Sequence, residues 1–235
     1  MTRRIGSATY ESAPMRTQFR DRYEAGELLA AQLTAYANKP DVIVLALPRG
    51  GVPVGAQVAR KLNAPFDVFV VRKLGFPGHP ELAMGAIASG GVRVFNGDVV
   101  NAFRIPDEVI NAVTAAEYQE LQRRERSYRD DLPPPEVEGK TVIVVDDGIA
   151  TGSTMMAAIS ALRQLNAGRV VVAAPTIART TYEHLRADCD EVVAVIVPAE
   201  FYGVGQWYQD FSQTTDEEVQ QLLGKFNHRD TSAAV

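Results

Sequence analysis

The sequence predicts an α/β protein: a doubly wound, mostly parallel sheet with helices on both faces and a small carboxyl-terminal hood. Short apolar runs rich in β-branched residues alternate along the chain with segments of helical periodicity. Runs that are apolar at nearly every position are typical of strands buried on both faces of a parallel sheet. Strands that alternate with helices favour right-handed crossovers within one sheet. We expect strands at residues 41–47, 66–71, 92–95, 142–145, 170–174 and 192–197.

The spacing of hydrophobic residues and the positions of helix-breaking residues predict helices between these strands. The opening segment carries apolar side chains at helical spacing, and a long charged helix ends before the breaker Pro133–Pro135. Residues 75–91 are rich in Gly and Pro, which predicts a mobile loop with one short helix. The expected helices cover residues 19–36, 52–62, 105–129, 155–165 and 179–187.

The length and composition of the chain limit its possible domain organisation and binding partners. With 235 residues, 46% of them hydrophobic, the chain can form one substantial core and a small accessory part. We expect a flexible tail at 1–18, a core at 19–197, and a hood and tail at 198–235. A net charge of −5 argues against nucleic-acid or anionic-membrane binding. Cys189 is the only cysteine, and no signal peptide or membrane-spanning run is apparent, so we expect a cytoplasmic protein.

The most informative stretch is Thr141–Met155, TVIVVDDGIATGSTM. An apolar strand ends at two acids, Asp146 and Asp147, and a small hydroxyl-rich turn leads into a helix. Backbone N–H groups of this turn can converge on a phosphate at the positive end of the helix dipole. The two acids would repel a bare phosphate, so sugar hydroxyls or a divalent cation must lie between the acids and the phosphate. The ligand implied is a sugar phosphate; the alternative is a pair of acids that only caps a helix.

This stretch closely resembles the phosphoribosyl pyrophosphate (PRPP) signature of the type I phosphoribosyltransferases. The resemblance implies that Asp146 and Asp147 hold the ribose hydroxyls and stabilise a cation-like sugar during the reaction. Gly148 departs from the pattern, which usually has a larger apolar residue there. Over residues 19–211 the chain looks most like bacterial proteins built on a phosphoribosyltransferase domain. The residues expected to wrap the 5′-phosphate are Ala150, Thr151, Gly152, Ser153 and Thr154.

Two further segments fall at the carboxyl ends of expected strands, where ligands bind in such sheets. Arg49, Gly50 and Gly51 resemble the family's pyrophosphate loop, and we expect a strained or cis non-proline peptide near Arg49. The alternative is a simple tight turn. Arg72 and Lys73 suit the departing pyrophosphate, with Lys73 the stronger catalytic candidate. In the family, a flexible loop near this place closes over the substrate. His79 and Glu81 lie in the corresponding segment here and are weaker candidates.

An aromatic-rich segment, residues 198–211, follows the last expected strand. It is similar to the hood of hypoxanthine-guanine phosphoribosyltransferases, where an aromatic side chain stacks on the purine. That resemblance implies base contacts from Phe201, Tyr202 and Val204. The alternative is that these aromatic residues anchor the segment on the core. The family enzymes often carry an acidic or basic residue that contacts the purine ring before this aromatic, and lysine is absent here, so purine specificity stays open.

The resemblance implies transfer of a phosphoribosyl group from PRPP to a nitrogen heterocycle, a nucleobase and preferably a purine, with release of pyrophosphate. Mg²⁺ is the expected cofactor, carried by PRPP with help from Asp146 and Asp147, because the protein alone shows no metal-ligand spacing. We expect a homodimer. The alternatives are a non-catalytic PRPP or nucleotide sensor and, last, a PRPP synthase, which would require an ATP site and a longer, duplicated chain.

Overall fold

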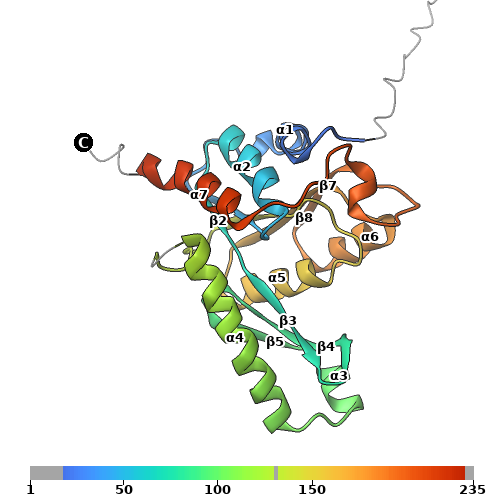
Figure 1. Cartoon of the computed structure of the whole chain (residues 1–235). Coiled ribbons are helices and arrows are strands. Elements are labelled where there is room, and N and C mark those ends of the chain that lie inside the picture. The colour runs from blue at the N-terminus through green and yellow to red at the C-terminus, as the bar shows by residue number, and fades with distance from the viewer. Residues whose placement is uncertain (1–17, 130–131, 231–235) are drawn as a thin grey trace, which may run out of the picture.

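The computed structural model describes residues 18–129 and 132–230, and its core is a five-stranded parallel sheet (Figure 1). The strands lie in the order β2–β1–β6–β7–β8, and every neighbouring pair is parallel. The predicted α/β class with a mostly parallel sheet is therefore confirmed. The strands are β1 (Val42–Ala46), β2 (Phe66–Val68), β6 (Thr141–Val145), β7 (Arg169–Thr176) and β8 (Glu191–Ile196).

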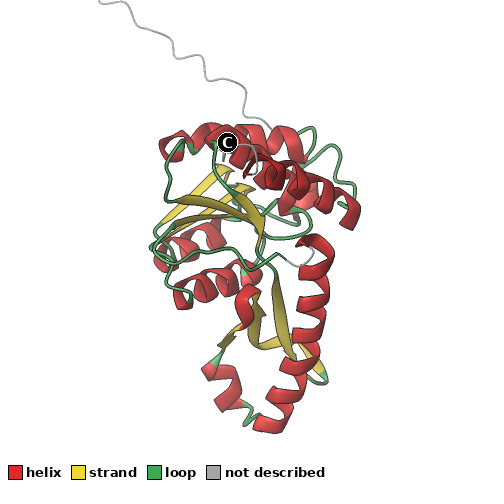
Figure 2. Ribbon diagram, turned by 90° about the vertical axis from the view of Figure 1, so that its left-hand side faces the viewer, coloured by secondary structure: helices red, strands yellow, loops and turns green. Residues whose placement is uncertain are grey.

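Helices cover both faces of this sheet, which explains why its strands are apolar at nearly every position (Figures 1 and 2). In β1, Val44 and Ala46 belong to one hydrophobic cluster, and Ile43 and Leu45 belong to another on the opposite face. The first cluster includes side chains of α1, α2 and α7, and the second includes those of α5 and α6. These helices are α1 (Arg22–Gln32), α2 (Gly51–Leu62), α5 (Ser153–Gln164), α6 (Arg179–Asp188) and α7 (Asp216–Asp230).

A second, antiparallel sheet of three strands replaces the loop expected at residues 75–91. It consists of β3 (Val71–Phe76), β4 (His79–Ala88) and β5 (Val92–Phe95), with a short 3₁₀ turn at Ser89–Gly91. The expected single strand at 66–71 is also wrong, because the chain leaves the parallel sheet after β2 and starts the new sheet at β3.

The physical reason for this error lies in where the glycines of the segment sit. Gly78, Gly90 and Gly91 have positive φ and turn the chain at the ends of β4. These glycines therefore form the turns between strands and are not part of one long loop. Within β4, Gly85 lies so close to β5 that a Cβ atom would be 2.4 Å from the carbonyl oxygen of Val94. A glycine in the middle of a strand often marks such a close approach.

The long helix α4 (Asp107–Arg129) runs beside the second sheet and reaches the parallel core (Figure 2). It contacts β3 and β4 along its length and α7 near its end. At that end the buried Arg129 pairs with Asp67 of β2, N–O 2.9 Å. The antiparallel sheet is therefore fixed to the core through α4 and also through α5, which contacts β3, β4 and β5 directly. The remaining short helices are α3 (Gly97–Ala102), η1 (Thr34–Tyr36) and η3 (Val204–Trp207).

The expected amino-terminal tail lies outside the described residues except for Gln18, and so do residues 231–235. Helix α7 falls in the region expected to be hood and tail, where no helix was foreseen. Within the described part of the chain, no helix has both the length and the apolar character needed to cross a membrane.

Candidate functional site

The site forms where β1 and β6, neighbours in the parallel sheet, end at the same edge. The loop after β1 and the loop after β6 touch there through two glycines. A Cβ atom on Gly50 would lie 2.1 Å from Oδ2 of Asp147, and one on Gly51 would lie 2.7 Å from the carbonyl oxygen of Val145. Only glycine fits this contact. The peptide bond between Pro48 and Arg49 is cis, as the sequence predicts for this loop.

The signature loop surrounds a small cavity of about 150 Å³ at the amino-terminal end of α5. Gly152 has φ 78°, a left-handed conformation that directs the chain into the helix at Ser153. Free N–H groups and the helix dipole make this end of α5 suited to an anion. All five predicted phosphate-binding residues line the cavity. The complete lining is Asp146, Gly148, Ile149, Ala150, Thr151, Gly152, Ser153, Thr154, Met155 and Val204.

Asp146 is the acid that faces this cavity. Its carboxylate is half-buried, and its Oδ1 accepts a hydrogen bond from the backbone N–H of Asp147 at 2.8 Å. Burial raises the pKa of Asp146 well above its ordinary value, and the neighbouring charge of Asp147 raises it further. A sugar hydroxyl or a cation in the cavity would therefore stabilise the ionised form.

Asp147 is buried and turned toward helix α1. Its Oδ2 accepts from both Nε and Nη2 of Arg22, each at 2.8 Å. Burial raises the pKa of Asp147, and the charge of Arg22 opposes that shift. Arg22 also donates from Nη1 to the carbonyl oxygen of Ser212 at 2.7 Å, and its guanidinium lies 4.0 Å from the ring centre of Phe211.

The sequence did not identify Arg22 as a site residue. It lies 125 positions from its partner Asp147, and its only local signal is that it follows the helix cap Asp21. The sequence also did not identify Tyr208 or Thr181 as site residues. The hydroxyl of Tyr208 donates to the backbone carbonyl of Asp147, and the hydroxyl of Thr181 donates to the backbone carbonyl of Ala150.

The departure at Gly148 has a structural reason. A Cβ atom there would lie 2.4 Å from Cγ1 of Val204, so the hood residue fills the space that a larger side chain would take. Among the three predicted base contacts, Val204 alone lines the cavity. Phe201 packs near Trp207, with ring centres 6.1 Å apart, and Tyr202 is 87% exposed. The structure therefore brings one of the three to the signature loop.

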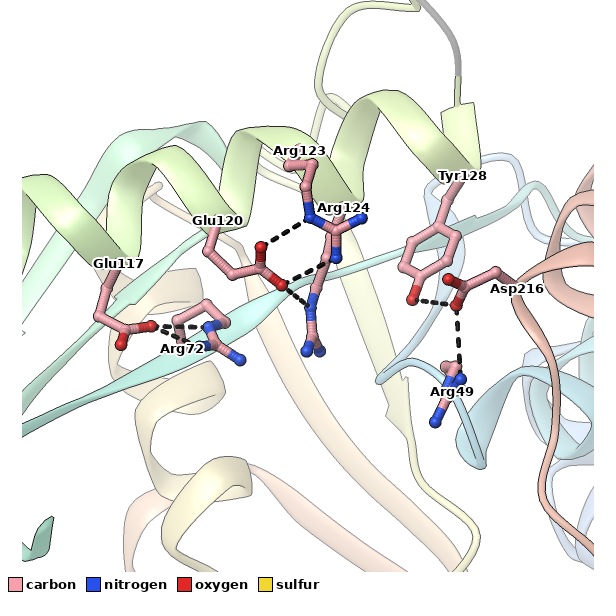
Figure 3. Close-up of polar contacts among 8 residues, drawn as sticks. All are labelled: Arg49, Arg72, Glu117, Glu120, Arg123, Arg124, Tyr128 and Asp216. Carbon is pink, nitrogen blue, oxygen red and sulfur yellow. Dashed lines mark hydrogen bonds and ion pairs between the residues drawn. The ribbon is translucent and has the colours of Figure 1, made fainter.

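Lys73 and Arg72 point to opposite sides of β3, because side chains alternate along a strand. Lys73 lines a larger cavity of about 400 Å³ together with Thr151, Ser153 and Thr154 of the phosphate loop. Arg72 instead pairs with Glu117 of α4, with N–O distances of 2.6 and 2.8 Å (Figure 3). The other residues around this cavity are Val71, Ala83, Gly85, Ala86, Val94, Phe95, Asn96, Met156, Ala157 and Ser160.

Arg49 projects toward the beginning of α7 (Figure 3). Its Nη1 lies 3.7 Å from Oδ1 of Asp216, and the hydroxyl of Tyr128 donates to the same carboxylate at 3.0 Å. Burial and the Asp216 carboxylate together raise the pKa of Tyr128 to about 12. The predicted pyrophosphate residue Arg49 therefore has a carboxylate partner in this structure.

Metal-binding groups are sparse. No group of three or more His, Cys, Asp or Glu side chains among the described residues could hold a metal ion. His79 stacks on Phe76, with ring centres 5.9 Å apart, and the side chain of Glu81 lies outside the described part of the structure.

Comparison with known proteins identifies the family of this chain. Residues 17–208 match the model of the phosphoribosyl transferase domain. Two curated proteins, from two strains of Mycobacterium tuberculosis, have names that give phosphoribosyl transferase as a provisional assignment. Each is 45% identical over 92% of this chain and 48% of its own length, so the chain spans about half the length of these relatives. The crystal structure of TT1426 from Thermus thermophilus is 41% identical, with a TM-score of 0.80, over 89% of this chain and 99% of that one. The chain belongs to the phosphoribosyl transferase domain family.

Proposed function

We propose that the protein transfers the phosphoribosyl group of PRPP to a ring nitrogen of a heterocyclic base and releases pyrophosphate. The observation that carries this proposal is the cavity at the start of α5, where one carboxylate and a glycine-bent, hydroxyl-rich loop face the same small space. A ribose 5-phosphate has the matching chemistry: a dianion at one end and vicinal hydroxyls a few ångströms away.

The pyrophosphate end of PRPP would extend from this cavity toward the loop after β1. Gly50 and Gly51 bring that loop against the two acids, and Arg49 supplies a cation there. As the C1–oxygen bond breaks, charge builds up on the pyrophosphate, and the guanidinium of Arg49 would stabilise it. Bond formation from the ring nitrogen to C1 completes the displacement, and the nitrogen loses its proton to solvent.

Mg²⁺ is part of the proposal as a substrate-carried ion. The described residues provide too few ligands for a metal site of their own, and Asp147 is already paired with Arg22. The pyrophosphate oxygens would hold the ion, with help from Asp146, the carboxylate that lines the cavity. A bound Mg²⁺ would neutralise part of the negative charge on the leaving pyrophosphate.

The acceptor would approach from the side of the hood. Val204 packs against Gly148 and lines the cavity at the start of α5, so residues beside it would lie near C1 of a ribose bound there. The exposed ring of Tyr202 is available for stacking on a flat heterocycle, which contributes about 1–3 kcal/mol in nucleic-acid binders. These features support a nucleobase, with a purine preferred because of its larger stacking area.

The test is pyrophosphate release from Mg²⁺–PRPP, measured with hypoxanthine, guanine, xanthine, adenine, uracil, orotate and a no-base blank. Release that depends on one base would establish the transferase and name its acceptor. Binding of PRPP, seen as a higher melting temperature, without release would favour a PRPP sensor instead. If PRPP changes neither signal, the proposed PRPP site is wrong.

A further inference from the structure

We propose that the two adjacent acids of the signature have separate tasks. Asp146 is the carboxylate that meets the ribose hydroxyls, and Asp147 is a positioning residue that Arg22 holds away from the sugar. This inference rests on the proposed function in one respect, that a ribose 5-phosphate binds at the signature loop.

The first argument is the direction of the two side chains. Asp146 lines the cavity together with the phosphate loop, and Asp147 does not. The carboxylate of Asp147 instead lies between Arg22 and Gly50, where no side-chain atom at position 50 could fit. A sugar in the cavity therefore faces the carboxylate of Asp146.

The second argument is the strength of the contact that holds Asp147. Two N–H groups of Arg22 reach the same oxygen at 2.8 Å, and the two side chains are 10% and 13% exposed. Removing one partner of such a buried pair leaves the other charge uncompensated, which is strongly unfavourable. Asp147 could turn toward a sugar only if that contact were broken.

The third argument is what this contact joins. Arg22 lies at the start of α1, and it also binds the carbonyl oxygen of Ser212 and stacks on Phe211. Tyr208 donates its hydroxyl to the backbone carbonyl of Asp147. Asp147 therefore ties α1, the pyrophosphate loop and the carboxyl-terminal segment to the end of β6, and this fixes the walls around the cavity.

The experiment compares two probes, ribose 5-phosphate and 2-deoxyribose 5-phosphate, by titration calorimetry. They differ by one hydroxyl, so the ratio of their dissociation constants reports whether a given residue contacts that hydroxyl. A hydrogen bond to a charged group predicts that the wild-type protein prefers ribose 5-phosphate by about tenfold or more. Asp146→Asn should reduce this preference to roughly threefold or less, because the carboxylate that accepts from the hydroxyl is gone.

Asp147→Asn and Arg22→Gln should behave differently. Both variants should weaken the binding of the two sugar phosphates by equal factors, on the order of tenfold. The preference for ribose 5-phosphate should remain, because only the walls of the site are disturbed. Arg22→Lys keeps a cation and should recover part of that affinity. The double variant, Arg22→Gln with Asp147→Asn, leaves no buried charge unpaired and should keep the preference even if Asp147→Asn alone does not fold.

The matched control is Arg163→Lys, which alters another arginine–aspartate pair, Arg163 with Asp190 at 2.7 Å, at the end of α5 opposite the cavity. It should leave both affinities unchanged within about twofold, whatever it does to the melting temperature. The inference is overturned if the variants without the Asp147 carboxylate lose the preference, or if Asp146→Asn keeps it. A wild-type protein that binds neither sugar phosphate would contradict the proposed function itself, and the division of tasks with it.

Discussion

Asp146 is a half-buried residue whose carboxyl pKa the fold raises, so it should make stability depend on pH in an identifiable direction. Between the pKa of the unfolded chain and the higher pKa of the native state, the native state binds more protons. The free energy of unfolding therefore falls as pH rises through that window, because ionising Asp146 costs stability. Ligand-free Asp146→Asn should melt at a higher temperature than the wild type at pH 8, and the difference should shrink toward pH 4.

A suitable comparison is Asp190, whose pKa is lowered: burial opposes the shift, while the N–H of Val170 and Arg163 favour the ionised form. Its ionised form is stabilised in the native state, so Asp190→Asn should lower the melting temperature at pH 8 and have less effect in acid. Thermal melts at several pH values measure both variants. A lower melting temperature for Asp146→Asn at pH 8 would contradict the assigned pKa shift.

How far the sequence predicts the site depends on the distance between the residues involved. The phosphate loop is one continuous segment, so residues 150–154 could be placed around a single cavity from their order alone. The contact between Arg22 and Asp147 joins residues 125 positions apart, and no local pattern links them. The burial of Tyr208 is likewise a product of packing, because the sequence shows only that it is aromatic.

At the level of elements, apolar strands buried on both faces were predictable and the antiparallel sheet was not, while α7 was overlooked although its pattern is in the sequence. Strands β3 and β4 contain glycines and charged residues, which is typical of loops as well as of partly exposed strands. Helix α7 carries Val219, Leu222 and Leu223 at helical spacing, and all three are buried in the core. That pattern was present in the sequence, but the aromatic segment before it led us to expect a hood and tail throughout.

The beginning of α7 provides a prediction at this scale, because Asp216 faces Arg49 (Figure 3). If Arg49 binds pyrophosphate, the Asp216 carboxylate competes for it. The two side chains are 36% and 41% exposed, so the pair contributes about 0–1 kcal/mol, which corresponds to at most about fivefold in affinity. Asp216→Asn should therefore tighten binding of Mg²⁺–pyrophosphate about two- to fivefold in titration calorimetry.

Glu217 is the matched control, an exposed acid in the same helical turn. Glu217→Gln changes the net charge equally and should leave the pyrophosphate affinity unchanged. Weaker binding by Asp216→Asn would show instead that Asp216 holds Arg49 in its working position.

At the scale of the whole molecule, the two sheets contribute different parts of the candidate site. The parallel sheet ends in the signature loop and the loop after β1, and the antiparallel sheet brings Lys73 to the cavity beside the signature loop. This arrangement depends on α4, which contacts the antiparallel sheet and is joined to the core by Arg129 and Asp67. Sequence patterns predict single elements better than such a relation between two sheets, because the contacts that fix it join residues far apart in the chain.

The role of Lys73 tests that arrangement. An exposed ammonium group in the same cavity as Thr151, Ser153 and Thr154 should attract a phosphate on the loop without a fixed contact. Lys73→Met should weaken binding of ribose 5-phosphate about three- to tenfold at low salt, and less at high salt because the interaction is screened. Arg93→Met removes a cation from β5 of the same sheet, at a residue that does not line the cavity, and should have little effect. Equal losses from both variants would mean that only net charge matters, and no loss from Lys73→Met would show that the antiparallel sheet contributes nothing to the phosphate site.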